Sequence, residues 1–281
     1  MVKKISTIVM LSLFFVGLSV LLYPSISSYW NSKTQSAAVK NYEELLEAMK
    51  GEDHTALFEE AESYNEALAE LENPLLDYPE VEGYHEILNP TGSGMMGYLT
   101  IPTIGVELPI YHTVSEDVLS HAAGHMEGTS FPIPGESTHT VLSAHRGLPN
   151  AKLFTDLNKL VVGDVFTITV LDKVFTYQVE QILTVLPENT QNIKVEQGEE
   201  YCTLLTCTPY GINTHRLLVQ AKRVDAVSNK TTYVGAEAYQ IDTLIVTPIV
   251  ALPILLTLIV IVCLQPVKKE RIIQEEGEEE L

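Results

Sequence analysis

The sequence predicts a mostly β domain, either a closed barrel or a sandwich, placed outside the membrane between two hydrophobic segments. Three observations predict it. Apolar stretches occupy both ends of the chain, and helically spaced apolar residues follow the first stretch. From Met96 onward, short β-type runs are separated by Gly, Pro and Asn, as in barrels and sandwiches.

The first apolar stretch runs from Ile5 to Leu22 and follows Lys3 and Lys4. A stretch of this kind is either a signal peptide or a membrane anchor. Bulky side chains occupy positions 20–23, where a signal peptidase requires small ones. We therefore predict that residues 1–24 form a cytoplasmic end and an uncleaved transmembrane anchor.

A second apolar stretch runs from Leu244 to Leu264, which is about 21 residues and roughly the length that a helix needs to cross a bilayer. It contains Pro248 and Pro253, which membrane helices tolerate. Basic residues follow this stretch as well as precede the first, so both termini are expected in the cytoplasm. The prediction is a two-pass cell-membrane protein whose acidic tail, residues 265–281, is a solvated end.

Between the two spans, the pattern changes from helical to β-type. Apolar residues recur three or four apart from Asn41 to Leu71, which predicts one or two amphipathic helices within a helical segment and linker at 25–94. The β-type domain is expected at 95–226, followed by a linker at 227–243. The predicted strands are Gly97–Ile101, Thr138–Ala144, Val165–Leu171, Phe175–Val185, Tyr201–Cys207 and His215–Val224.

Charge and cysteine content exclude some classes of function. The 281 residues carry a formal net charge of −20, and basic residues do not cluster outside the termini, so nucleic acid is not an expected partner. Three cysteines are too few for a disulfide framework. Cys202 and Cys207 would lie about 16 Å apart on one extended strand, beyond the roughly 7 Å limit for a bridge.

Cys207 is the first candidate for chemistry, because it ends an apolar run and a turn-forming sequence follows it. Cys202 is an odd number of residues away, so strand alternation sends the two side chains to opposite faces. One of them is expected in the core. The alternative for either is a small buried apolar residue.

Arg216 returns to the level of Cys207 on the next predicted strand. An arginine that faces a thiol favours the thiolate and can donate to the oxyanion formed when a carbonyl is attacked. The alternative is a surface arginine paired with one of the many carboxylates.

A thiol nucleophile also needs a proton acceptor, and eight histidines compete for that role. His145 has the best setting, because it ends a strand-like run and precedes a turn. His139, His215 and His112 lie in or beside strands and are alternatives that spacing does not rank.

His121 and His125 have the spacing of zinc ligands on a helix. The glycine between them weakens a helix, and a metalloprotease would need a glutamate after the first histidine. We therefore predict no metal and no cofactor.

The stretch from Thr203 to Arg216 closely resembles the active-site hairpin of sortases. Its Thr-Leu-x-Thr-Cys pattern matches the sortase signature, and the block through Arg216 is similar to the pilus-assembling class C group. The resemblance spans roughly Met96 to Val224 and includes Gly97–Pro102, Gly124–Ser130 and Ser143–Pro149.

This resemblance implies an eight-stranded sortase-type barrel with Cys207 as nucleophile, His145 as acid/base and Arg216 as the oxyanion-stabilising cation. It implies cleavage between Thr and Gly of a Leu-Pro-x-Thr-Gly sorting signal through an acyl-thioester. In class C, a Lys amine of another pilin resolves that intermediate and pili are polymerised. The implied partners are pilins or other surface proteins that carry the signal.

Two alternatives remain: a sortase that anchors single proteins to cell-wall peptide, and a non-catalytic membrane-tethered peptide-binding protein. One departure from class C lies at 73–84, a possible lid. The Asp-Pro-aromatic triplet of class C lids is absent there, so lid residues are not carried over. We expect a linker with Asp77 solvated and Tyr78 packed on the outside of the barrel, rather than a lid over Cys207.

Overall fold

The computed structural model describes residues 2–49, 53–225, 253 and 257. The chain divides into two compact units, one made of Met1–Leu22 and Val234–Leu281 and the other of Tyr23–Tyr233. The second unit holds the β domain and every candidate site residue. The predicted linker at 227–243 and the acidic tail lie outside the described residues, and so does the predicted second span except for residues 253 and 257.

Helix α1 runs from Val2 to Ala48 and continues through Pro24, so the chain stays helical beyond the predicted anchor. Within the described residues, a single helix has the length and apolarity to cross a bilayer. It is Leu11–Ala48, whose most apolar window has a mean hydropathy of 1.7 and contains no buried residue. A membrane anchor and a signal sequence near an N-terminus both have these properties, so the helix is compatible with the predicted anchor.

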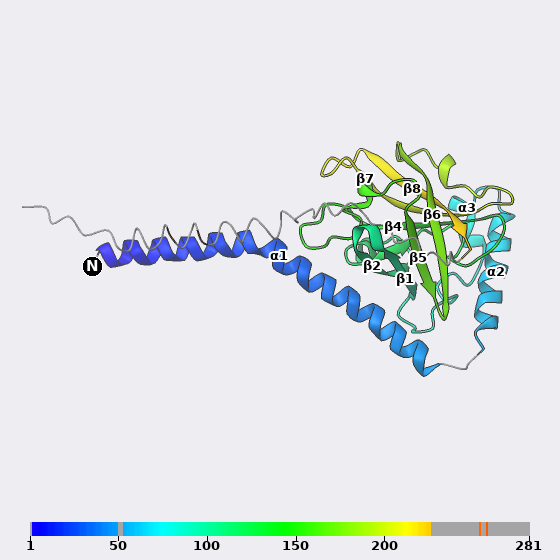
Figure 1. Cartoon of the computed structure of the whole chain (residues 1–281), viewed down its shortest axis with the longest axis horizontal. Helices are drawn as coiled ribbons and strands as arrows, with labels where there is room; N and C mark the ends of the chain where they lie inside the picture. Colours follow the sequence, from blue (N-terminus) through cyan, green and yellow to red (C-terminus); the bar gives the residue numbers. More distant parts are fainter. Residues whose placement is uncertain (1, 50–52, 226–252, 254–256, 258–281) are drawn as a thin grey trace, which may run out of the picture. The chain divides into compact units, whose positions relative to one another are not determined.

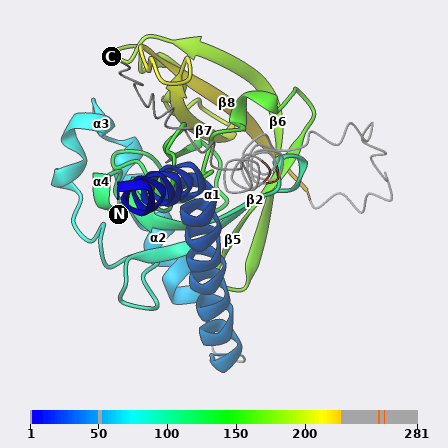
Figure 2. The same ribbon diagram turned by 90° about the vertical axis from the view of Figure 1, so that its left-hand side faces the viewer.

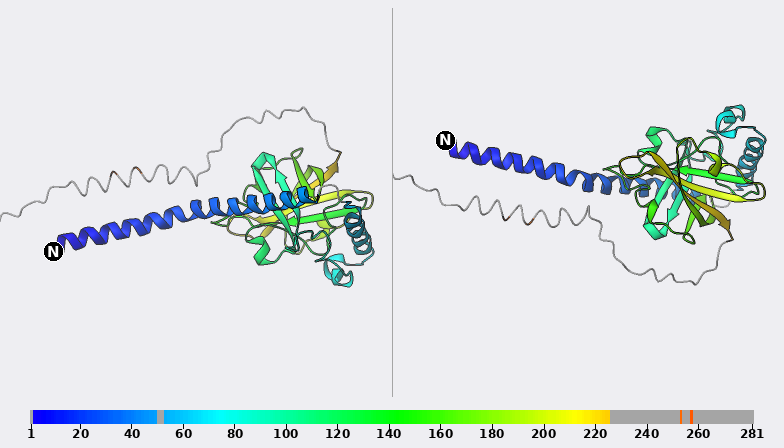
Figure 3. Two further views of the ribbon diagram at one scale, coloured as in Figure 1. Left: turned by 90° about the horizontal axis from the view of Figure 1, so that it is seen from below. Right: turned by 90° about the horizontal axis from the view of Figure 1, so that it is seen from above.

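The C-terminal part of α1 lies along the β domain (Figure 3). The Tyr42 hydroxyl donates to the carbonyl of Met96 at 3.0 Å and accepts from the amide of Leu171 at 2.9 Å. Burial without such partners would be costly for a phenol. Tyr42 therefore fastens α1 both to a strand at Met96 and to a turn at Leu171.

The β domain is a closed barrel (Figure 1). Its strands are β1 (Met95–Ile101), β2 (Val106–His112), β3 (Ala123–His125), β4 (Thr138–Ser143), β5 (Val165–Val170), β6 (Lys173–Val185), β7 (Glu200–Thr208) and β8 (His215–Val224). The helical elements after α1 are α2 (Thr55–Ala69), α3 (Pro74–Asp77), η1 (Tyr78–Glu80), η2 (Pro102–Ile104), α4 (Glu116–Leu119), η3 (Leu157–Lys159) and η4 (Gln191–Ile193).

The strands close in the order β1-β2-β3-β4-β7-β8-β6-β5, so the barrel is confirmed and the sandwich is not. All six predicted strands are present within two residues of their expected ends. β2 and β3 were not predicted from the local pattern, since β2 contains Pro109 and β3 has only three residues. Most pairs are antiparallel, but β2 with β3 and β4 with β7 are parallel.

Helix α2 packs against the barrel beside β6 (Figure 1). Tyr64 is buried, and its ring centroid lies 4.8 Å from that of Phe131. Asn65 accepts a 2.7 Å hydrogen bond from the amide of Phe131. Tyr64 and Phe131 belong to one buried cluster, so the barrel core continues under α2. Full burial of a large apolar side chain contributes about 1.5–3 kcal/mol to folding stability.

Candidate active site

The parallel pairing of β4 with β7 brings two candidate residues to one edge of the barrel. Ser143, the last residue of β4, pairs with Leu205; His145 follows Ser143 by two residues, and Cys207 follows Leu205 by two residues on β7. Parallel strands run in the same direction, so both positions reach the same level beyond the last registered pair.

Two hydrogen bonds continue this alignment past the end of β4. The amide of Ala144 donates to the carbonyl of Leu205 at 3.2 Å, and the buried hydroxyl of Thr206 donates to the carbonyl of Ala144 at 2.7 Å. The threonine before Cys207 therefore fastens the backbone next to His145 onto β7. This explains physically why a threonine suits that position of the motif.

Antiparallel pairing supplies the third candidate, because Cys207 stands directly opposite Arg216 in the ladder between β7 and β8. Figure 2 shows these two strands side by side. Directly opposed residues project to the same face of a sheet. All three candidates therefore lie at one edge of the barrel.

The two cysteines of β7 differ in environment, which confirms that one of them belongs to the core. Cys202 is fully buried, and this burial raises the pKa of its thiol well above the ordinary range. Cys207 is partly exposed. A thiol becomes a nucleophile only as an accessible thiolate, so Cys207 is the candidate that chemistry can use.

Arg216 is held by its own hairpin. Its Nη1 donates to the carbonyls of Asn213 and His215, each at 3.3 Å. A guanidinium has five N–H donors, so these two bonds leave others for a substrate oxygen. The position of Arg216 is thus fixed while other N–H groups of its guanidinium can still donate to a substrate.

Arg146, next to His145, serves a different purpose. Its Nε donates to the carbonyl of Thr155 at 3.2 Å, Nη1 to the Thr208 hydroxyl at 3.2 Å and Nη2 to Asn158 Oδ1 at 2.8 Å. All three nitrogens are thus engaged within the protein. Arg146 braces the loop after His145 against the end of β7, and Arg216 remains the better oxyanion candidate.

Two histidines that competed with His145 are framework residues. His112 is buried, with its ring nitrogens 2.9 Å from the carbonyls of Gly94 and Ile87. His139 is buried between the Lys194 carbonyl and the Thr203 hydroxyl, both at 2.8 Å. Burial lowers the pKa of both imidazoles. His215, partly exposed beside Thr214, starts β8 opposite Thr208.

His121 and His125 do not share a helix face, because His125 lies in β3 and His121 precedes it. The ring of His125 is fully buried between the Tyr84 hydroxyl at 3.0 Å and the Ser130 carbonyl at 2.9 Å. His121 is exposed and bonds to Ser120. The structure therefore gives His125 a packing role and leaves the pair without ligand geometry.

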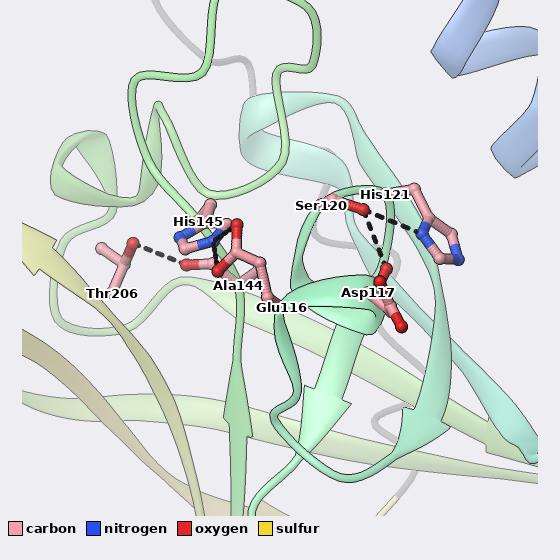
Figure 4. A network of polar contacts seen from close by, with 7 residues as sticks. All are labelled: Glu116, Asp117, Ser120, His121, Ala144, His145 and Thr206. Carbon is pink, nitrogen blue, oxygen red and sulfur yellow. Dashed lines mark hydrogen bonds and ion pairs between the residues drawn. The ribbon is translucent and has the colours of Figure 1, made fainter.

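The His145 side chain is partly exposed, and its Nε2 is 3.2 Å from Oε2 of Glu116 (Figure 4). The sequence did not single out Glu116. It is one of 37 acidic residues, and a contact across 29 positions leaves no local signal.

A pocket of about 380 Å³ extends from Arg216 along the barrel. Leu205 and Leu218 line it from β7 and β8, and the end of β6 and the segment after it line it at residues 185–187, 189 and 190. Leu75 and Tyr78 also line it, so the segment at 73–84 reaches the same pocket as Arg216. Glu127 lines the pocket as well, so a largely apolar wall carries one cation and one carboxylate, and such a groove suits an extended peptide whose carbonyls need a donor.

Tyr78 packs against the barrel, where it is half-buried and lines this pocket. Asp77 accepts a 3.2 Å hydrogen bond from the amide of Asn73, the residue before its own short helix. Arg216 bonds to its own hairpin instead.

Comparisons with known proteins show which family this chain is similar to. The family model for the sortase domain matches residues 99–224. The crystal structure of sortase C1 from Streptococcus agalactiae is 42% identical, with a TM-score of 0.61, and the match covers 67% of this chain and 98% of that one. The chain belongs to the sortase family. Sortases are cysteine transpeptidases.

Two further sortases match. A pilus-related sortase C of group B Streptococcus is 39% identical with a TM-score of 0.59, and the match covers 67% of this chain and 97% of that one. Sortase A of Streptococcus agalactiae is 30% identical over 131 residues, which are 46% of this chain. The matched part is 52% of that protein, so this sortase spans about half the length of that relative.

Proposed function

We propose that this sortase is a membrane-anchored transpeptidase that cleaves a Leu-Pro-x-Thr-Gly-like sorting signal and joins it to a Lys amine of another pilin subunit. The observation that carries the proposal is the ladder position of Cys207 opposite Arg216, with His145 brought level by the β4–β7 register. The apolar N-terminal part of α1 is the proposed anchor, and the barrel is expected on the outer side of the membrane.

The reaction follows from these three side chains. The Cys207 thiolate attacks the carbonyl carbon of the signal threonine, and Arg216 stabilises the oxyanion that forms. The C–N bond to glycine breaks as His145 gives a proton to the leaving amine. The product is an acyl-thioester on Cys207.

A second amine completes the transfer. It enters where the glycine left, loses a proton to His145 and attacks the thioester, so that the thiolate is released and an isopeptide bond forms. Water competes with the amine unless it is poorly placed in the site. The apolar walls from Leu75, Tyr78, Leu205 and Leu218 favour a bound peptide over ordered water in this pocket.

The class of acceptor is the finer part of the proposal. Support for pilin lysine comes from the match to a pilus-related sortase C at 39% identity, which covers nearly all of that chain. The rival acceptor is the amine of a cell-wall peptide, which a sortase that anchors single proteins would use.

The test is to incubate the full-length protein in detergent with a sorting-signal protein and two acceptors, a lysine-bearing pilin domain and an oligoglycine peptide. Mass analysis of the products identifies the amine that is joined. We expect a pilin–pilin isopeptide product, and Cys207→Ala is the inactive control. Transfer only to oligoglycine would replace pilin polymerisation with single-protein anchoring. Absence of any acyl-enzyme or product would reject transpeptidation and favour a peptide-binding role.

A further inference from the structure

Figure 4 shows the His145 imidazole between the carboxylate of Glu116 and strand β7. Nε2 lies 3.3 Å from Oε1 and 3.2 Å from Oε2 of Glu116, so both carboxylate oxygens face one ring nitrogen. The other ring nitrogen, Nδ1, lies on the side of Thr206, which precedes Cys207 on β7. We propose that Glu116 is a positioning residue that orients His145 and reserves its Nδ1 for proton exchange with Cys207. This proposal rests on the function proposed above.

The segment that carries Glu116 is anchored in the core. The amide of Thr113 donates to the buried Tyr84 hydroxyl at 3.1 Å, and the amide of Val114 donates to Glu127 at 3.2 Å. The segment also packs closely on β3, because a Cβ atom on Gly124 would come within 2.3 Å of the Thr113 carbonyl oxygen. Helix α4 therefore starts from a fixed backbone, which limits where the Glu116 carboxylate can go.

His145 is held from the opposite side. Its carbonyl accepts the amide of Phe154 at 3.1 Å, and the preceding carbonyl of Ala144 accepts the Thr206 hydroxyl. These bonds fix the backbone of His145 but leave the rotation of its ring to its own contacts. The Glu116 carboxylate supplies such a contact, since it accepts only from a protonated ring nitrogen.

The proton transfers of the reaction balance when Glu116 has this role. With Nε2–H donating to Glu116, Nδ1 accepts the proton of the Cys207 thiol, and both ring nitrogens then carry protons. Nδ1–H gives its proton to the leaving amine, and Nδ1 later takes one from the incoming amine. Glu116 stays ionised throughout and stabilises the doubly protonated ring by charge, as the acid of a nucleophile–histidine–acid triad does.

Solvent limits the size of the effect. The Glu116 side chain is 82% exposed and that of His145 is 28% exposed. Exposed ion pairs contribute little, so we expect loss of the carboxylate charge to lower kcat about 3- to 5-fold.

The experiment uses full-length protein in detergent with a sorting-signal peptide. Glu116→Gln should lower kcat about 3- to 5-fold with KM within about two-fold, because the pair acts on proton transfer and not on peptide binding. Glu116→Asp keeps the charge and should recover part of the lost rate. The matched control is Asp117→Asn on the next residue of α4, which Figure 4 shows turned away from His145; its kcat should equal that of wild type.

A second measurement does not depend on turnover. The rate at which iodoacetamide alkylates Cys207, followed by mass mapping of its peptide, should fall in Glu116→Gln and not in Asp117→Asn. Wild-type kcat and wild-type alkylation in Glu116→Gln would overturn the proposal, and so would an equal loss in Asp117→Asn. If the wild type forms no acyl-enzyme, the proposed function fails, and the alkylation rates alone then decide the role of Glu116.

Discussion

Gly128 and Pro74 are in such close contact that the glycine has no room for a side chain. A Cβ atom on Gly128 would lie 2.5 Å from the carbonyl oxygen of Pro74 and 2.7 Å from the Cα atom of Leu75. Because Leu75 and Tyr78 line the pocket at Arg216, this contact sets where one wall of the pocket stands.

We expect Gly128→Ala to lower the free energy of unfolding by about 2–4 kcal/mol. Roughly 1–2 kcal/mol comes from the left-handed backbone, where φ is +77°, and the remainder from the clash with residues 74–75. The control is Gly163→Ala, which has a φ of +98° and no heavy atom within 4 Å of the added Cβ. Denaturant titration of both variants isolates the clash, and equal losses would mean that residues 74–75 yield without cost.

The double change Asp77→Ala, Tyr78→Ala should leave the alkylation rate of Cys207 within about three-fold of wild type. Asp77 bonds to Asn73, and Tyr78 lines the pocket near Arg216, so neither is tied to the thiol by a hydrogen bond in this structure. Timed alkylation with mass mapping gives the rate. A rise of about ten-fold, equivalent to roughly 1.4 kcal/mol of closure energy, would show that the segment is a lid over Cys207.

Cys207→Ala should abolish both cleavage and transfer while the fold remains, because it removes the nucleophile from a partly exposed strand end. Cys202→Ala is the matched control on the same strand. It should stay active, since its thiol is fully buried. Peptide turnover and thermal unfolding of the two variants check this, and the reverse pattern would move the nucleophile to Cys202.

Arg216→Lys should lower kcat about 100-fold, because an ammonium does not reproduce the planar fork of donors that an oxyanion requires. Arg223→Lys on the same strand is the control. Arg223 bonds to Glu200 at 3.2 Å at the other end of β8, so its variant should turn over peptide at close to the wild-type rate. A near-normal kcat for Arg216→Lys would make Arg216 a structural cation.

Acid should destabilise the fold through His125. Full burial lowers the pKa of this imidazole from 6.5 to about 4. Between those values the unfolded chain binds the proton and the folded chain does not, so stability falls as pH drops from 6.5 toward 4, by about 3 kcal/mol in all.

The measurement is the free energy of unfolding against pH for wild type and His125→Gln. The variant is expected to be less stable at pH 7, because Tyr84 and Ser130 lose their partner, but its curve should be flatter below pH 6.5. Parallel curves would mean that other groups carry the acid sensitivity.

Local patterns were enough to predict most strands and to single out Cys207 and Arg216 as candidates. Runs such as Val165–Val170 and His215–Val224 have turns at both ends, and a strand leading into a turn is visible in any single sequence. Cys207 and Arg216 fall at two such strand ends across one short connection, so their proximity follows from the hairpin alone.

The tertiary structure decided what depends on distant pairings. The register of β4 with β7 joins residues 138–143 to 200–205, and this register brings His145, one of eight histidines, level with Cys207 and places His139 among buried partners. The contact between Glu116 and His145, the pocket shared by Tyr78 and Arg216, and the short strand β3 likewise form only when the barrel closes. Side chains far apart in sequence leave no periodic trace of their contact, because that contact depends on how the strands pair and not on the residues beside them.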